Sequence, residues 1–353
     1  MNLLLFILFF LGVVALICKL LDIHPKLASC FDQGMASFGS LLVSLCGWYV
    51  VMIPLINNQQ QTLLQLFKNL PINFNIFIGC FLAPDLGGYH IIEAYDSNIN
   101  MIIFAGICLT SILGCFFSFQ LPIFLNQIKE DLPTLMYGFT IGIITLPITL
   151  IPLAMLLNIS LLHLIPIFIL CGTLLLGIIY FQHITLKLIV IFAKTIQYIT
   201  YLLFTMVMIG LFIYPNLIDV TLLQEACIIV LKMSIIICGS LVLSQLLIKY
   251  FHKPLNQLAT YLHIDMNSML GLLLSLGSSI AMLPLYSKMN KTGKKMNAAF
   301  SISGAYVLGG QFAFIANICP QSSIYFILTK LVAGIISIIT VYLLTKKKDF
   351  RPF

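Results

Sequence analysis

Asp85 is the only carboxylate that lies well inside an apolar stretch of the sequence, in the string Pro84-Asp85-Leu86-Gly87-Gly88. An ionised carboxylate at bilayer depth costs about 2.5–3.5 kcal/mol on insertion scales unless a cavity or a partner compensates it. We therefore expect Asp85 to face a solute, water or a cation. The structural alternative is that Asp85 caps a half-helix by accepting hydrogen bonds from the amides of Gly87 and Gly88.

A second group of polar side chains lies in the C-terminal third: Ser275, Ser278, Ser279, Asn297, Ser301, Ser303, Gln311 and Asn317. Hydroxyl and amide groups can hydrogen-bond a neutral or cationic solute, but they also join helices at about 0.6–2 kcal/mol each. The pair Gly309-Gly310 indicates either an interruption or a close helix approach. The candidate solute-binding residues are therefore Asp85, Gly87, Gly88, Ser278, Ser279, Gly310 and Gln311.

His90 and Glu93 are three positions apart, so one helix face could present both to a metal ion. Two ligands are too few for a metal site, and an ion pair at the membrane interface is the better interpretation. The sequence contains no nucleophile elbow, no His-Glu-x-x-His motif and no phosphate-binding loop. We expect a protein that is not an enzyme and that holds no metal ion or cofactor.

The elements that position these residues must lie in a lipid bilayer. Of 353 residues, 61% are hydrophobic and 8% are charged, which leaves too little polar surface to cover a soluble globule. The ten cysteines lie mostly inside apolar runs without a Cys-x-x-Cys pair, which favours packing over disulfides or metal binding. The net charge of +7 lies mainly in short loops, so membrane topology explains it better than nucleic-acid binding does.

Eleven apolar segments joined by loops follow one another along the chain, and two of them are interrupted. The segments cover residues 1–18, 34–56, 73–92, 99–126, 132–157, 160–181, 187–214, 225–249, 267–287, 298–318 and 322–345. Segment 73–92 is broken by Pro84, Asp85, Gly87 and Gly88, and segment 267–287 by Gly277, Ser278, Ser279 and Pro284. Such breaks free backbone groups that hydrocarbon cannot satisfy. We predict that both segments are re-entrant hairpins and that the other nine span the membrane; broken helices that cross in pairs are the alternative.

The basic residues favour the hairpins. If all eleven segments crossed, the loop with Lys249 and the loop with Lys288 would face opposite sides, against the positive-inside tendency. With nine spanning helices and the N-terminus outside, 14 of the 18 basic residues are cytoplasmic. Of the others, Lys68 lies in an outer loop, and Lys194, Lys232 and Lys330 lie within segments.

The same topology divides the chain into two five-element units joined by one helix. The units are residues 1–157 with hairpin 73–92 and residues 187–345 with hairpin 267–287; residues 158–186 hold the linking helix and 346–353 a short basic cytoplasmic tail. The second unit is inverted relative to the first, which is typical of secondary transporters that bind solute at broken helices near the midplane. The alternative is that glycine and proline only pack or kink helices. We predict an all-α, polytopic membrane transporter for a small polar solute.

Several strings carry a resemblance to a known family. In the C-terminal third these are Phe251-His252-Lys253-Pro254-Leu255, Gly271 to Met282, Lys288 to Lys294 and Asn297 to Ser303. Nearer the N-terminus they are Pro84 to Gly88 and the string Gly142 to Ile148. They resemble the ethanolamine-utilisation permease family, EutH, and shorter matches cover most of the remaining chain.

The resemblance implies a permease of the cytoplasmic membrane for ethanolamine or a related amino alcohol, with Asp85 as the counter-ion of the ammonium group. Two family elements differ here. Its Leu-Ala-Asn-Asn-Ile-Pro-Met has Ser278 and Ser279 in place of the two asparagines, and its Gly-Asp-His-Leu-Gly-Phe has Gly310 and Gln311 in place of aspartate and histidine. A membrane scaffold or accessory subunit derived from a permease is the alternative, and a homo-oligomer is compatible with either.

Overall fold

A computed structural model describes residues 3–52, 54–55, 59, 73–82, 87–121, 124, 128 and 131–348. These ranges form helices and turns without any strand, which confirms the predicted all-α class. Within them, three helices are long and apolar enough to cross a membrane: Leu132–Leu156, Val220–Leu247 and Pro320–Lys346. The bent pair Phe6–Leu20 and Pro25–Val43 adds a fourth if it forms one span. Nine spanning helices therefore stays a prediction.

The chain forms two compact units, each assembled from separate segments. Unit 1 comprises Met1–Ala36, Phe124–Thr149 and Met233–Phe353, and unit 2 comprises Ser37–Ile123 and Leu150–Lys232. The predicted hairpin at 267–287 belongs to unit 1, and the predicted hairpin at 73–92 belongs to unit 2.

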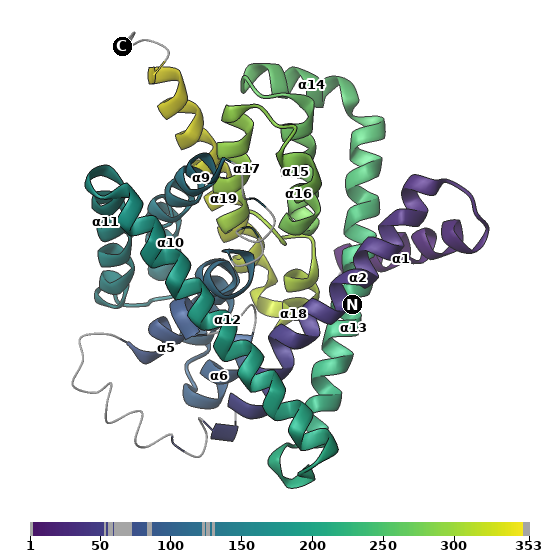
Figure 1. Ribbon diagram of the computed structural model, residues 1–353, viewed down its shortest axis with the longest axis vertical. Coiled ribbons are helices and arrows are strands. Elements are labelled where there is room, and N and C mark those ends of the chain that lie inside the picture. Colours follow the sequence, from purple (N-terminus) through teal and green to yellow (C-terminus); the bar gives the residue numbers. More distant parts are fainter. Residues whose placement is uncertain are drawn as a thin grey trace. The chain divides into compact units, whose positions relative to one another are not determined.

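Unit 1 is built around helix α17, which packs against α9, α15 and α19 (Figure 1). Small residues allow this close packing: a Cβ atom on Gly138 of α9 would lie 2.5 Å from the Lys295 carbonyl oxygen, and one on Gly142 would lie 2.6 Å from that of Ala299. The helices that lie wholly or mainly in unit 1 are α1 Leu3–Leu20, α9 Leu132–Ile144, α13 Val220–Tyr250, α14 His252–Tyr261, α15 Met266–Gly277, α16 Leu283–Tyr286, α17 Lys291–Ser303, α18 Gly310–Ile318 and α19 Ser323–Lys348.

Unit 2 has the helix η3, Ile102–Gly114, at its centre, and every residue of η3 is buried. The flanking segments of the first hairpin pack against it: η2, Ile78–Leu82, and α6, Gly87–Tyr95. The other helices of unit 2 are η1 Trp48–Met52, α5 Phe74–Phe77, α7 Ile99–Met101, η4 Phe116–Gln120, η5 Leu161–Leu164, α11 Ile165–Tyr180, α12 Gln182–Phe212 and η6 Pro215–Leu217, while α2 Pro25–Gly47 and α10 Pro147–Leu156 lie in both units.

Two element boundaries differ from the sequence prediction. Helix α2 begins at Pro25, within what was expected to be a loop ahead of segment 34–56. The stretch between residues 249 and 267 was also expected to be a loop, but it contains α14. Ala259 of α14 is buried, with Leu255 and Leu262 packed near it. The loop prediction was wrong because basic and polar residues interrupt the apolar pattern, while burial of one face still stabilises a helix.

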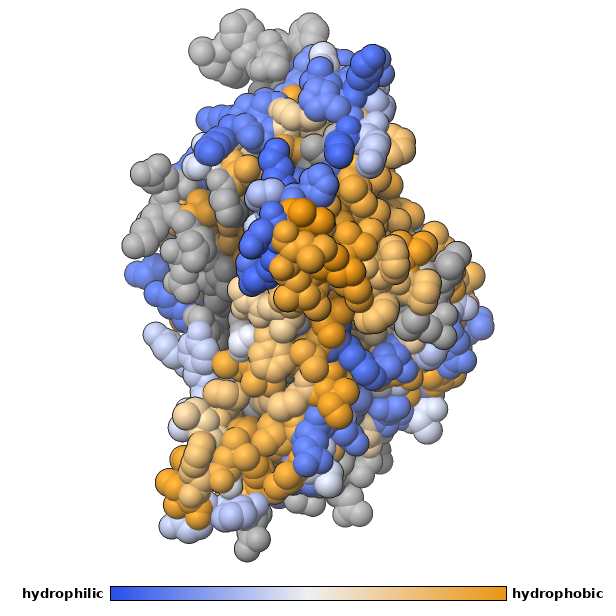
Figure 2. All heavy atoms as spheres, turned by 90° about the vertical axis from the view of Figure 1, so that its right-hand side faces the viewer, coloured by the Kyte–Doolittle hydropathy of each residue, from blue (hydrophilic) through white to orange (hydrophobic). Residues whose placement is uncertain are grey.

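Large apolar side chains are exposed over much of the molecule. Leu20, Leu162 and Phe212 are 72%, 70% and 85% exposed, and Figure 2 shows broad apolar areas on the face it displays. Water would disfavour such areas, whereas lipid chains solvate them. Nine of the ten cysteines are buried, as expected for packing residues; Cys227 is half-buried.

Contacts in unit 2 recur in unit 1 at a constant interval. A Cβ atom on Gly79 of η2 would lie 2.6 Å from the Ala105 carbonyl oxygen of η3. Gly271 follows Gly79 by 192 positions, and its Cβ atom would overlap the side chain of Asn297, which follows Ala105 by the same 192 positions. In each predicted hairpin segment, a glycine thus lies against the helix that follows it.

The same interval of 192 positions relates two further helix contacts, one in each unit. A Cβ atom on Gly47 of α2 would lie 2.9 Å from the Phe204 nitrogen of α12. Gly239 follows Gly47 by 192 positions and Gly12 precedes Phe204 by 192, and a Cβ atom on Gly12 would lie 3.5 Å from the Gly239 nitrogen. Thus α2 packs on α12 in unit 2, and α13 packs on α1 in unit 1.

Candidate functional site

The second hairpin breaks where its sequence predicted. Helix α15 ends at Gly277, Ser278 has an extended backbone with φ −159° and ψ 123°, and a 3-10 turn, η7, covers Ser279–Met282. Ser278 and Ser279 are both buried, and the Ser279 and Tyr306 hydroxyl groups lie 2.7 Å apart. Two buried hydroxyl groups therefore meet beside the break.

A second break faces the first one. The helical path that begins with α17 is interrupted from residue 304 to residue 309, and the amides of Tyr306 and Leu308 donate to the carbonyl oxygens of Ser275 and Leu276 at 2.9 Å and 2.8 Å. Carbonyl groups at a helix end need such donors, since the helix itself supplies none. The two breaks satisfy each other inside the protein, which is the condition for irregular backbone at membrane depth.

Gly309 lies at the end of the helix interruption and also packs closely against another backbone segment. The sequence had left these two interpretations as alternatives. A Cβ atom on Gly309 would overlap the carbonyl oxygen of Gly277. Only glycine allows the two backbones to come this close. Gly310 begins α18 directly after the contact and is buried.

Gln311 lies in the first turn of α18 and contacts a buried lysine. Lys330 Nζ, on α19, donates to Gln311 Oε1 at 3.0 Å, and the ammonium group lies 5.5 Å from the centre of the Phe326 ring. Lys330 is 0% exposed and Gln311 2% exposed. A buried ammonium is costly, so its polar and aromatic surroundings must compensate it.

A side-chain hydrogen bond joins the two ends of the first predicted hairpin. Asn75 Nδ2 donates to Asp96 Oδ2 at 2.6 Å. A straight helix would separate residues 75 and 96 by about 30 Å, at 1.5 Å per residue. Tyr89 lies against Gly106, next to Ala105, which Gly79 contacts. The segments on either side of residues 83–86 therefore lie side by side, and their outer ends meet at Asn75 and Asp96.

Hydrogen bonds also join the ends of the second hairpin. The backbone amide of Asn290 donates to the Asp265 carboxylate, and Asn290 Nδ2 donates to the His263 carbonyl oxygen at 3.1 Å. Asp265 also caps α15 by accepting from the Ser268 amide. An Asn–Asp contact thus holds the ends of each hairpin together.

The predicted residues of the first hairpin are placed only in part. Asp85 lies outside the described residues, together with Pro84 and Leu86. Gly87 and Gly88 form the start of α6, and Gly88 is buried. They belong to unit 2, whereas Ser278, Ser279, Gly310 and Gln311 belong to unit 1.

His90 and Glu93 contact each other, as residues three positions apart on one helix can. The structure shows their contact, and the predicted ion pair stays a prediction. His90 Nδ1 lies 3.5 Å from Glu93 Oε2, and the His90 ring packs edge-on against Tyr49 at 4.6 Å between ring centres. Glu93 Oε1 accepts from the Tyr89 hydroxyl at 2.9 Å. In the described part of the chain, no group of three or more His, Cys, Asp or Glu side chains could hold a metal ion.

The position of Lys330 in the sequence already marks it as unusual. Lys330 lies in the middle of a long apolar run, as Asp85 does, and an ionisable residue at membrane depth marks a functional site by default. No sequence pattern indicates the contact between Tyr306 and Ser279, because it depends on how two breaks that are distant in the sequence pack together.

Long apolar helices with buried, mutually satisfied breaks define a multi-pass, all-helical membrane protein. The model of the family "Ethanolamine utilisation protein, EutH" matches residues 1–344, so the chain belongs to that family of EutH-like permeases. It is 26% identical to the probable ethanolamine permease EutH of Listeria monocytogenes over 335 residues, covering 92% of this chain and 89% of the relative.

Two further relatives cover most of the chain. The probable ethanolamine permease EutH of Salmonella typhimurium is 24% identical over 349 residues, covering 90% of this chain and 86% of its own. The uncharacterized protein YxeR of Bacillus subtilis is 27% identical over 323 residues, covering 86% of this chain and 84% of YxeR. No solved structure matches the chain.

Proposed function

We propose that the chain is a permease that moves ethanolamine or a related amino alcohol across the cytoplasmic membrane. The observation that carries the proposal is the pair of breaks at Gly277–Ser278 and 304–309, which places buried hydroxyl groups and irregular backbone inside an apolar protein. Membrane transporters use such broken helices to bind solute. The names of the curated relatives support the same substrate class.

The proposed architecture is an inverted repeat of residues 1–157 and 187–345 with nine spanning helices. The constant interval of 192 positions between Gly79 and Gly271, and between Gly47 and Gly239, supports two copies of one plan. The distribution of basic residues supports the proposed inversion, with the N-terminus outside and the C-terminus in the cytoplasm.

The two hairpins contribute different chemistry to the proposed function. Asp85 of the first hairpin pairs with the substrate ammonium, and the Gly87 and Gly88 amides orient that carboxylate or a substrate oxygen. Ser278 and Ser279 of the second hairpin hydrogen-bond the substrate hydroxyl. Gly310 has no side chain, so it leaves the backbone at the start of α18 accessible to the substrate.

Lys330 decides which end of the substrate the second hairpin can take. Gln311 Oε1 already accepts a hydrogen bond from the Lys330 ammonium, at 3.0 Å. A second ammonium beside it would be repelled, since like charges interact strongly in a buried site. The second hairpin should therefore take the hydroxyl end of an amino alcohol and not its ammonium group.

Uptake of labelled ethanolamine by proteoliposomes tests the function. The wild-type chain should accumulate label, and Asp85→Asn should reduce uptake by at least tenfold because the ammonium loses its counter-ion. Asp219→Asn is the matched control: Asp219 is exposed at the start of α13, where it accepts from Thr221. Equal uptake by wild-type and Asp85→Asn would remove Asp85 from the site, and no uptake by wild-type would favour the scaffold alternative.

A further inference from the structure

A basic cavity opens in unit 1 where α2 and α13 move apart. The two helices meet closely at Gly34, where a Cβ atom would lie 2.7 Å from the Cys238 nitrogen, and the Cys238 thiol donates to the Phe31 carbonyl at 3.4 Å. Beyond this contact, the start of α2 and the end of α13 border an open cavity of about 950 Å³. It is lined by His24, Pro25, Lys26, Leu27, Gln245, Leu246, Lys249, Tyr250 and His252.

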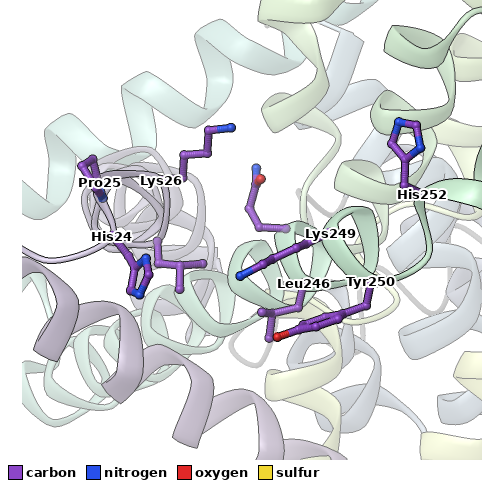
Figure 3. Close-up of a pocket in the computed structure, with 9 residues that line it drawn as sticks. His24, Pro25, Lys26, Leu246, Lys249, Tyr250 and His252 are labelled. Carbon is purple, nitrogen blue, oxygen red and sulfur yellow. The ribbon is translucent and has the colours of Figure 1, made fainter.

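The cavity lining is positively charged. Figure 3 shows Lys249 reaching from α13 toward His24, with Lys26 on the other wall and His252 farther away at the edge. Among the described residues, none of those that line the cavity is acidic. Two ammonium groups and two imidazoles around one cavity favour an anion with several oxygen acceptors, such as a phosphate group.

Apolar side chains flank the same cavity on both sides. Leu20, Leu21 and Ile23 are exposed on and beside the turn from α1 to α2, and Tyr250 and Phe251 are exposed at the end of α13. Aromatic rings and lysines next to exposed aliphatic side chains are typical of the membrane interface. A soluble phosphate would use only the charges, whereas a phospholipid would use the apolar flanks as well.

We infer that this cavity binds the phosphate headgroup of an anionic phospholipid. Lys26 and Lys249 contact the phosphate oxygens from opposite walls, and Leu246 and Tyr250 contact the glycerol and the first part of the acyl chains. Basic pockets between membrane helices are the general means by which membrane proteins hold such headgroups. The inference depends only on membrane insertion and not on the transported substrate.

Titration of the detergent-solubilised full chain with dioctanoyl phosphatidylglycerol tests this site. Thermal shift and native mass spectrometry give its affinity, with dioctanoyl phosphatidylcholine and glycerol 3-phosphate as the comparison ligands. The anionic lipid should bind and stabilise the wild-type chain more than either of them. Lys26→Gln/Lys249→Gln should weaken its binding about 25-fold, from roughly fivefold for each lysine.

Lys187→Gln/Lys288→Gln is the control that removes the same charge elsewhere. Both lysines are exposed and lie outside the cavity. This control should bind phosphatidylglycerol as the wild-type chain does. Unchanged binding by Lys26→Gln/Lys249→Gln would overturn the site, and equal stabilisation by glycerol 3-phosphate would overturn its assignment to a lipid.

Discussion

Lys330 Nζ lies 3.0 Å from Gln311 Oε1, and the two side chains join α19 to the first turn of α18 inside unit 1. Gln311 therefore stabilises a buried cation, in addition to any role toward a solute. The family element that this segment resembles has a histidine at the position of Gln311. The difference from the family therefore lies at a residue that contacts Lys330. A neutral amide oxygen is always available as an acceptor, whereas an imidazole nitrogen accepts only when unprotonated.

Gln311→Leu should destabilise the protein by about 1.5–3 kcal/mol, the range for hydrogen bonds to charged groups, because Lys330 loses this acceptor in a buried site. Thermal unfolding in detergent measures the change. The double variant Gln311→Leu/Lys330→Met should recover part of the loss, since it replaces the polar pair with apolar side chains of similar size. A single variant as stable as wild-type would show that the contact contributes little.

Gly309→Ala should destabilise the protein by about 3 kcal/mol or more, because the added methyl group overlaps the Gly277 carbonyl oxygen and backbone must move. Gly172→Ala in α11 is the matched control, as a Cβ atom there meets nothing within 4 Å. That control should be neutral or gain up to about 1 kcal/mol from helix propensity. Equal unfolding temperatures for both variants would contradict the close approach of the two breaks.

The sequence was sufficient to locate the break in segment 267–287, because Gly277, Ser278 and Ser279 interrupt an apolar helix whose freed backbone groups must be satisfied inside the protein. The break predicted at Pro84–Gly88 lies mostly outside the described residues and stays a prediction. The sequence also indicated that Gly309 is special. It could not indicate that Tyr306 and Leu308 supply the amides for Ser275 and Leu276, because such pairing is set by tertiary contacts between distant segments. Helix α14 was missed for a related reason: its buried face is too narrow to dominate a polar sequence.

Asp131 gives the structure a dependence on acid pH. Burial raises the pKa of Asp131, but hydrogen bonds from Thr134 and Lys294, together with the charges of Lys294 and Lys291, lower it more, so that it lies below its ordinary 3.8. A carboxyl group with a lowered folded-state pKa stabilises the fold above its unfolded pKa and loses that effect as the pH falls through the folded value. The loss should therefore begin near pH 4 and continue below it.

The measurement is the unfolding temperature of wild-type and Asp131→Asn between pH 7 and pH 3. Wild-type should be more stable at pH 7, and the difference should shrink below about pH 4, where Asp131 becomes neutral like asparagine. The effect should be small, because one third of the Asp131 side chain is exposed. Lys294→Met should move the loss to higher pH, and a difference that stays constant over the whole range would exclude this linkage.

The contact between Asn75 and Asp96 predicts a cross-link that a spanning helix cannot form. The two side chains are hydrogen-bonded at 2.6 Å, whereas a continuous helix would hold the two positions about 30 Å apart. In a background without the native cysteines, Asn75→Cys/Asp96→Cys should therefore react efficiently with a short bifunctional thiol reagent in the membrane. Each single cysteine variant controls for links between molecules. Efficient labelling of both cysteines without an intramolecular link would mean that segment 73–92 does not turn back on itself, and the assignment of a re-entrant hairpin would fall with it.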